Sequence, residues 1–88
     1  MLHFRPTRQF DKDMKTVSKR HLNIDLLEEV VQRLAGGQKL PDRYRDHLLV
    51  GKYRGDRECH IQPDWLFVYH IEGQDLIGTR TGSHADLF

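Results

Sequence analysis

The chain has 88 residues, of which 38% are hydrophobic and 31% charged, with six histidines and a formal net charge of +1. This size and composition predict one small globular domain over residues 1–88 and exclude a disordered chain. No stretch approaches the ~20 apolar residues of a membrane span. The start "MLHFRPTRQF" lacks the apolar centre of a signal peptide, and the single Cys59 cannot form an internal disulfide. We therefore expect a soluble, cytoplasmic protein.

The residues before position 38 predict one strand and two helices. Residues 2–7 alternate apolar and polar side chains, which is typical of a short strand. Thr7 is then placed to cap a helix. The apolar positions of that helix recur at helical spacing: Phe10, Met14 and Val17. A second helix is predicted to begin at Asp25, which with Glu28 resembles a capping box, and to end at Gly36–Gly37. Its apolar stripe contains Leu26, Leu27, Val30, Val31 and Leu34.

The rest of the chain predicts a long loop followed by a sheet. Residues 38–49 show no clear period, and a loop of this length in a small domain is often functional. Strands with a period of two are predicted at 50–55, 57–62, 65–71 and 76–82. The run "WLFVYHI" is almost continuously apolar, so it is expected at the centre of the sheet. The predicted class is α+β, with helices on one face of a largely antiparallel sheet.

The near-neutral net charge conceals an uneven distribution. Residues 1–57 contain 13 lysines and arginines against eight acidic residues, whereas residues 58–88 contain Arg80 against five acidic residues. A basic first two-thirds can attract phosphate groups. It is equally compatible with a solvated, charged helical surface, so charge alone leaves both interpretations open.

Five side chains suggest acid–base chemistry. His47, His60 and His84 stand beside turns or polar loops, and Asp64 lies in the turn after His60. Histidine titrates near neutral pH, so it can take or give a proton. With Arg80, these groups could cleave a phosphodiester, which needs a base, an acid and a cation to stabilise the charged phosphorane. Each residue also has a purely structural explanation, as a turn former, a solvated polar residue or an ion-pair partner.

Metal ions and unpaired bases are the two other ligands that the residues allow. Histidine and aspartate can bind zinc, but no two of the three candidate histidines have the short local spacing of a metal motif, so we expect no metal. Four aromatic side chains could stack on bases: Trp65, Tyr53, Tyr44 and Phe88. Core packing is the alternative for Trp65.

Four motifs resemble the YafQ toxins, a branch of the RelE/ParE superfamily of bacterial toxin–antitoxin systems. They are "Y-x-D-H-x-L-x-G" at 44–51, "H-x-x-P-D-W" at 60–65, "R-T-G-[ST]-H" at 80–84, and the closing "L-F". Each motif is weak alone, but their order and spacing in a chain of this length are specific. The strand–helix–helix–sheet order also fits, so the resemblance covers essentially the whole chain.

The resemblance implies a RelE-like fold and an endoribonuclease that cuts mRNA in the ribosomal A site. In that family the 2′-hydroxyl of the RNA attacks the adjacent phosphate, so no metal or other cofactor is implied. The implied acid/base set is His47, His60, Asp64 and His84. Expected substrate contacts are Arg80, Trp65 and Phe88.

The resemblance also implies two kinds of partner. One is the 70S ribosome with its mRNA. The other is a cognate antitoxin, a ribbon-helix-helix protein similar to DinJ or RelB, whose segment on the toxin is expected to be acidic because residues 1–57 are basic. The alternative function is a non-catalytic toxin or binding module of the same fold that inhibits gyrase or translation. The three histidines favour the nuclease.

Overall fold

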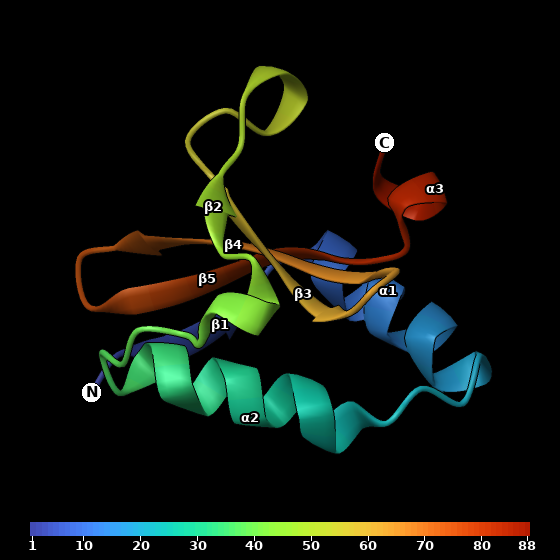
Figure 1. Cartoon of the computed structure of the whole chain (residues 1–88), viewed down its shortest axis with the longest axis horizontal. Coiled ribbons are helices and arrows are strands. Elements are labelled where there is room, and N and C mark those ends of the chain that lie inside the picture. The colour runs from blue at the N-terminus through green and yellow to red at the C-terminus, as the bar shows by residue number, and fades with distance from the viewer.

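Two helices cover one face of a five-stranded sheet in the computed structural model, which describes residues 1–88 (Figure 1). The chain starts with β1 (His3–Pro6), α1 (Arg8–Lys19) and α2 (Ile24–Ala35). Three short elements follow: the 3-10 helix η1 (Asp42–Tyr44), strand β2 (His47–Leu48) and the 3-10 helix η2 (Gly51–Tyr53). The last elements are β3 (Arg57–Gln62), β4 (Trp65–Glu72), β5 (Asp75–Gly82) and α3 (His84–Leu87). None of the helices has the length and apolar character needed to cross a membrane.

The sheet has the order β1-β5-β4-β3-β2. Strand β1 runs parallel to β5, and the other neighbouring strands are antiparallel. Strand β4 lies in the centre because its apolar run needs cover on both faces, and its first five residues are all buried. The predicted α+β class and the central place of this strand are confirmed.

The main core lies between the sheet and the two long helices, and it contains 13 buried residues. Phe10 of α1 meets Phe67 of β4 edge-on, with ring centroids 5.9 Å apart. Side chains alternate along a strand, so Cys59 and Ile61 of β3 point toward this core. The apolar stripe of each long helix faces the sheet.

The opposite face of the sheet, here called the open face, is covered only in part. A second cluster of four buried residues lies there: Tyr53, Leu66, Val68 and Leu87. Figure 1 shows the segment that contains η2 and the short helix α3 on the side of the sheet away from α2. The predicted helices therefore share one face, while α3 was not predicted and lies over the other.

One predicted strand is wrong. Residues 50–55 do not extend, because Gly51 and Gly55 have φ angles of 73° and 96° and η2 forms between them. Instead, the strand that pairs with the outer edge of β3 is β2, whose two residues lie in the segment predicted as a loop. The partner of β3 is thus shorter than expected, and most of the outer edge of β3 stays unpaired.

The predicted N-terminal cap is confirmed for α1 but is wrong for α2. Thr7 caps α1 as predicted, because its hydroxyl accepts the Phe10 N–H at 3.0 Å. The cap of α2 is Asn23, whose side chain accepts the Asp25 N–H at 3.1 Å. Asp25 therefore lies inside the first turn, and the predicted capping box with Glu28 does not form.

Candidate active site

Three titratable side chains from two neighbouring strands meet on the open face. His47 lies opposite Glu58 in the β2–β3 register, and His60 follows Glu58 by two positions on β3. The strand period therefore brings all three to the same face. Oε1 of Glu58 lies 3.3 Å from Nε2 of His47 and 3.3 Å from Nε2 of His60. We call these three residues the histidine–glutamate cluster.

Glu58 is the buried member of this cluster. Only 4% of Glu58 is exposed, whereas 16% of the His60 side chain and half of the His47 side chain are exposed. A buried carboxylate is costly unless a positive charge compensates it. The two imidazoles are the basic groups that lie within 4.0 Å of it, and each directs its Nε2 toward the carboxylate. The cluster therefore places two basic rings around a buried carboxylate close to the protein surface.

The histidine–glutamate cluster also has the composition of a metal site. It offers one ligand atom from each residue, and these atoms lie within 4.8 Å of one another. Two imidazole nitrogens and a carboxylate oxygen suit transition metals such as zinc or copper. Local spacing in the sequence did not reveal this set, because only strand pairing brings His47 beside β3.

A second pair of groups lies at the rim of the open face. His84 is the first residue of α3, and Asp64 lies in the turn between β3 and β4. Oδ1 of Asp64 accepts the backbone N–H of His84 at 2.9 Å and lies 2.7 Å from Nδ1 of its ring. These two contacts, the backbone bond first, lower the pKa of Asp64. Ionised Asp64 can only accept hydrogen bonds, so Nδ1 carries a hydrogen and Nε2 is free for proton transfer.

The rim pair and the histidine–glutamate cluster are adjacent. The rings of His60 and His84 have centroids 5.7 Å apart. Exposure of the side chain rises from 16% at His60 to 53% at His84. A ligand can therefore reach both rings from solvent, while Glu58 stays buried behind His60.

Arg80 reaches the open face from β5 but is tied to α1. Arg80 pairs with Val68, next to a register shift in the β4–β5 pairing that leaves Thr79 without a partner. Its Nε and Nη2 donate to the carboxylate of Asp13 at 2.8 and 3.0 Å, and its Nη1 donates to the Tyr53 hydroxyl at 3.2 Å. The bond to Asp13 is the main cause that raises the pKa of Arg80. About two of the five guanidinium N–H groups remain free for an anion.

Tyr53 connects Arg80 to the C-terminal helix. Its hydroxyl donates to the backbone carbonyl of Leu87 at 3.0 Å and accepts from Arg80. The ring of Phe88 packs edge-on against Tyr53, with centroids 5.3 Å apart. This chain of contacts docks α3, and with it His84, against η2.

The structure brings the predicted catalytic residues to one face: His47, His60, Asp64, Arg80 and His84. The four predicted stacking residues differ in their exposure to solvent. Trp65 is 2% exposed, and its indole N–H donates to Oγ1 of Thr81 at 2.9 Å, so neither face of its ring is open to a base. Tyr44 and Tyr53 are also buried, whereas Phe88 is 60% exposed.

Sequence reasoning missed two acidic residues of this site, Glu58 and Asp13. The alternation in "ECH" was a signal for Glu58, since it puts this residue on the same strand face as His60. No local pattern identified Asp13, whose partner Arg80 lies 67 residues away.

The chain is similar to known bacterial toxins in both sequence and structure. The family model described as "Bacterial toxin of type II toxin-antitoxin system, YafQ" matches residues 2–88. The mRNA interferase toxin YafQ of Escherichia coli K12 is 38% identical over 81 residues, which are 91% of this chain and 88% of that protein. A copper-bound mutant toxin from Helicobacter pylori superposes with a TM-score of 0.94 at 36% identity, over 100% of both chains. The toxin in the Escherichia coli DinJ–YafQ complex superposes with a TM-score of 0.90 at 35% identity, over 100% of this chain and 99% of that one.

Proposed function

Because the chain belongs to the YafQ family of bacterial toxins of type II toxin–antitoxin systems, we propose that it is an endoribonuclease that cleaves mRNA on the ribosome. The observation that carries this proposal is the row of acid–base groups on the open face. His84 is held by Asp64 with Nε2 free, and its ring lies beside that of His60. The Escherichia coli relative is named an mRNA interferase, which fits this chemistry.

The proposed reaction uses the 2′-hydroxyl of the RNA as nucleophile. A bond forms between O2′ and phosphorus, and the bond between phosphorus and O5′ breaks. The products carry a 2′,3′-cyclic phosphate and a 5′-hydroxyl. One ring of the His60–His84 pair takes the proton from O2′, and the other gives a proton to O5′. Centroids 5.7 Å apart leave both rings within reach of one phosphate group.

The neighbouring residues have supporting roles in this proposal. Asp64 orients the His84 ring through Nδ1. Glu58 positions the rings of His60 and His47 through contacts of 3.3 Å to their Nε2 atoms. Arg80 places its remaining N–H groups toward the phosphate and stabilises the charge that develops on the phosphorane.

Metal has no required part in this reaction. The Helicobacter pylori relative is described as copper-bound, and His47, Glu58 and His60 of this chain fit a transition-metal ion by composition and distance. A bound ion would supply a fixed positive charge there. It would also occupy nitrogen lone pairs that proton transfer needs, so we propose that metal at the cluster inhibits cleavage.

Two partners complete the proposal. The complex of the Escherichia coli relative pairs YafQ with DinJ, and we propose a cognate antitoxin for this chain as well. The second partner is the 70S ribosome, which presents mRNA in its A site and places the activity in the cytoplasm.

Single-turnover cleavage of mRNA on purified ribosomes tests this function. We expect wild-type protein to produce 2′,3′-cyclic phosphate ends, to remain active in excess EDTA when polyamines keep the ribosomes intact, and to be slowed by Cu²⁺. The variant His84→Ala should lose about 10²- to 10⁴-fold in rate yet still fold and bind the antitoxin. A His84→Ala protein that still arrests growth would instead support the alternative, a non-catalytic toxin of the same fold. Loss of cleavage in EDTA that zinc restores would make the cluster a catalytic metal site.

A further inference from the structure

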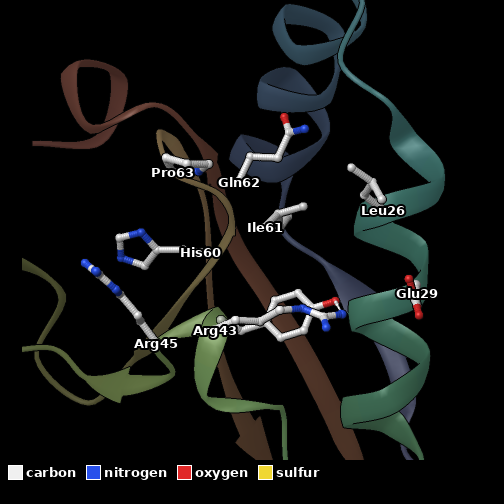
Figure 2. A pocket seen from close by; sticks show the side chains of 9 residues that line it. Leu26, Glu29, Arg43, Arg45, His60, Ile61, Gln62 and Pro63 are labelled. Atoms are coloured by element: carbon white, nitrogen blue, oxygen red, sulfur yellow. Dashed lines mark hydrogen bonds between the residues drawn. The ribbon is translucent and has the colours of Figure 1, made fainter.

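A cavity of about 500 Å³ opens beside the histidine–glutamate cluster. Figure 2 shows Arg45 and His60 on one side of it and Leu26 and Glu29 of α2 on the other. The full lining is Leu26, Glu29, Arg43, Tyr44, Arg45, His60, Ile61, Gln62 and Pro63. Its volume lies in the range of ~300–1,000 Å³ that small-ligand sites occupy. Because His60 belongs to both, a ligand in this cavity would be continuous with a ligand on the acid–base groups.

The cavity exists because β2 is short. Strand β2 pairs only with Arg57 and Glu58, so no strand pairs with the rest of β3 on its outer side. An unpaired strand edge presents free backbone N–H and C=O groups. The end of β3 and the start of the next turn, from His60 to Pro63, form the floor of the cavity. It therefore offers backbone hydrogen-bonding groups as well as side chains.

The cations at this cavity have no acidic partner. Neither Arg43 nor Arg45 forms an ion pair with a carboxylate, whereas the carboxylate of Glu29 is already paired with Arg33 at 3.2 Å. Arg45 is also one of two non-glycine residues with a positive φ, 50°. This left-handed conformation ends η1, because Arg45 is its C-cap and donates its backbone N–H to the Asp42 carbonyl. Two exposed arginines that form no ion pair, in a cavity whose one carboxylate is paired with Arg33, are suited to bind an anion.

The same cavity offers a surface for a flat, apolar group. The guanidinium carbon of Arg43 lies 4.8 Å from the centroid of the Tyr44 ring, and its Nη2 donates to the Tyr44 hydroxyl at 3.1 Å. The guanidinium is thereby held over the aromatic ring. Unpaired bases stack on such planar groups. Leu26 and Ile61 supply apolar contacts on the other side.

We propose that this cavity is a nucleotide-binding subsite that holds an RNA nucleotide adjacent to the scissile phosphate. Arg45 contacts its phosphate, and the base stacks on Arg43 between Leu26 and Ile61. The inference rests on the proposed function, because it takes the scissile phosphate to lie at His60 and His84. It adds a second contact that fixes the register of the RNA at the acid–base groups.

Binding of a short 2′-O-methyl RNA hexamer tests the subsite without cleavage, because the nucleophile is blocked. Fluorescence anisotropy is measured with wild-type protein and with Arg43→Gln and Arg45→Asn, at several salt concentrations. We expect each variant to weaken binding about tenfold. Arg45→Asn should also reduce the slope of log affinity against log salt by about 0.7, the value for one lost contact to a single-strand phosphate. Arg45→Gly, which suits the positive φ, is the second variant if Arg45→Asn melts at a lower temperature.

Arg8 gives the matched control. It is exposed on α1 and forms no ion pair, so Arg8→Gln removes the same charge away from the cavity. Methyl NMR signals of Leu26 and Ile61 should shift when wild-type protein binds the hexamer. Affinities of Arg43→Gln and Arg45→Asn equal to that of Arg8→Gln, or unshifted methyl signals, would overturn the subsite.

The antitoxin is measured in parallel, since an acidic peptide could use the same arginines. Variants that keep RNA affinity but lose antitoxin affinity would assign the cavity to the antitoxin and overturn the proposal. Cleavage on the ribosome separates the subsite from the proposed function. If wild-type protein does not cleave mRNA but the two variants lose RNA binding, the function fails and only RNA binding at the cavity remains, without a scissile phosphate beside it. If wild-type protein cleaves and the variants bind RNA normally, only the subsite fails.

Discussion

The two faces of the central sheet are built from the same strands but carry different kinds of side chain. On β3, Cys59 and Ile61 point to the core under the helices, whereas Glu58 and His60 point to the open face. The helix-covered face buries a cluster of 13 residues, and the open face buries a cluster of four. Reactive groups are thus placed on the outside of strands whose other side is locked by packing. Such placement holds the groups in fixed positions without covering them.

The largest expected effect is on the open face and concerns rate. We expect His60→Ala to lower single-turnover cleavage by about 10²- to 10⁴-fold, because it removes a proton-transfer group. The free energy of unfolding should fall by about 1–3 kcal/mol, because most of the side chain is buried and its loss leaves the buried Glu58 carboxylate with one basic partner fewer. His3→Ala, which removes an exposed histidine from β1, is the control. A His60→Ala enzyme with a nearly normal rate would remove His60 from the proposed mechanism.

Substitutions on the helix-covered face should lower the free energy of unfolding instead. Phe67→Ala removes a fully buried ring that contacts Phe10. We expect a loss of about 3–5 kcal/mol in the free energy of unfolding, measured by urea denaturation. Phe88→Ala is the matched substitution on the open face. It removes a largely exposed ring with one aromatic contact and should cost about 1 kcal/mol or less. Equal losses in the two variants would mean that the faces do not differ as described.

The contact between Asp13 and Arg80 connects α1 to the open face, so its loss should change both stability and cleavage rate. Asp13 lies on α1 but holds Arg80 of the open face. We expect Asp13→Asn to cost about 1–3 kcal/mol in the free energy of unfolding, because it weakens a buried, charged hydrogen-bond network. Cleavage should slow as well, since Arg80 loses its fixed position. Asp11→Asn, on the exposed side of the same helix, should change stability by no more than about 0.5 kcal/mol. Unchanged cleavage in Asp13→Asn would show that Arg80 needs no such support.

The pH dependence should separate the acid–base groups from Asp64. The pKa of Asp64 is lowered by His84, so this carboxylate is charged at every pH above the ordinary value of about 3.9. Its contribution is present above that value and is lost only as the pH falls through the lowered pKa. Changes in rate between pH 5 and 9 are therefore expected from the histidines, whose ordinary pKa is about 6.5.

We expect a bell-shaped rate profile with a maximum between about pH 6 and 8 under single-turnover conditions. His84→Ala should remove one limb of the bell, whereas Asp64→Asn should lower the rate about tenfold and keep both limbs. A wild-type profile that is flat from pH 5 to 9 while chemistry limits the rate would exclude histidine acid–base catalysis.

The smallest expected effect is at the exposed edge where α3 meets α1. Arg20 donates from Nη2 to Oδ1 of Asp86 at 3.0 Å, and both side chains are partly exposed. Ion pairs of this kind contribute about 1 kcal/mol or less and weaken with salt. We expect Arg20→Ala to lower stability by at most that amount in low salt and by less in 1 M NaCl. A large loss that salt does not change would mean that Arg20 does more than pair with Asp86.

The sequence alone predicted the parts of the fold that depend on local patterns. Apolar periods located α1, α2 and β3–β5, and the continuous run at 65–71 placed β4 in the centre. Motif spacing indicated the family, which the family model bears out. Local patterns were less reliable where a backbone change at one residue decides the outcome. Positive φ angles at Gly51 and Gly55 replaced a predicted strand with η2, and Asn23 took the capping role expected of Asp25.

Tertiary structure decided which residues act together. Glu58 joins His47 and His60 only because β2 pairs with β3, and Asp13 meets Arg80 only because α1 packs beside β5. These contacts join residues that are distant along the chain, so no local period or motif contains them. Tertiary structure also removed one predicted residue, Trp65, from the site. Its motif suggested contact with RNA, but the strand alternation turns its ring into the core, where burial of a large apolar surface stabilises the fold more than exposure to solvent would.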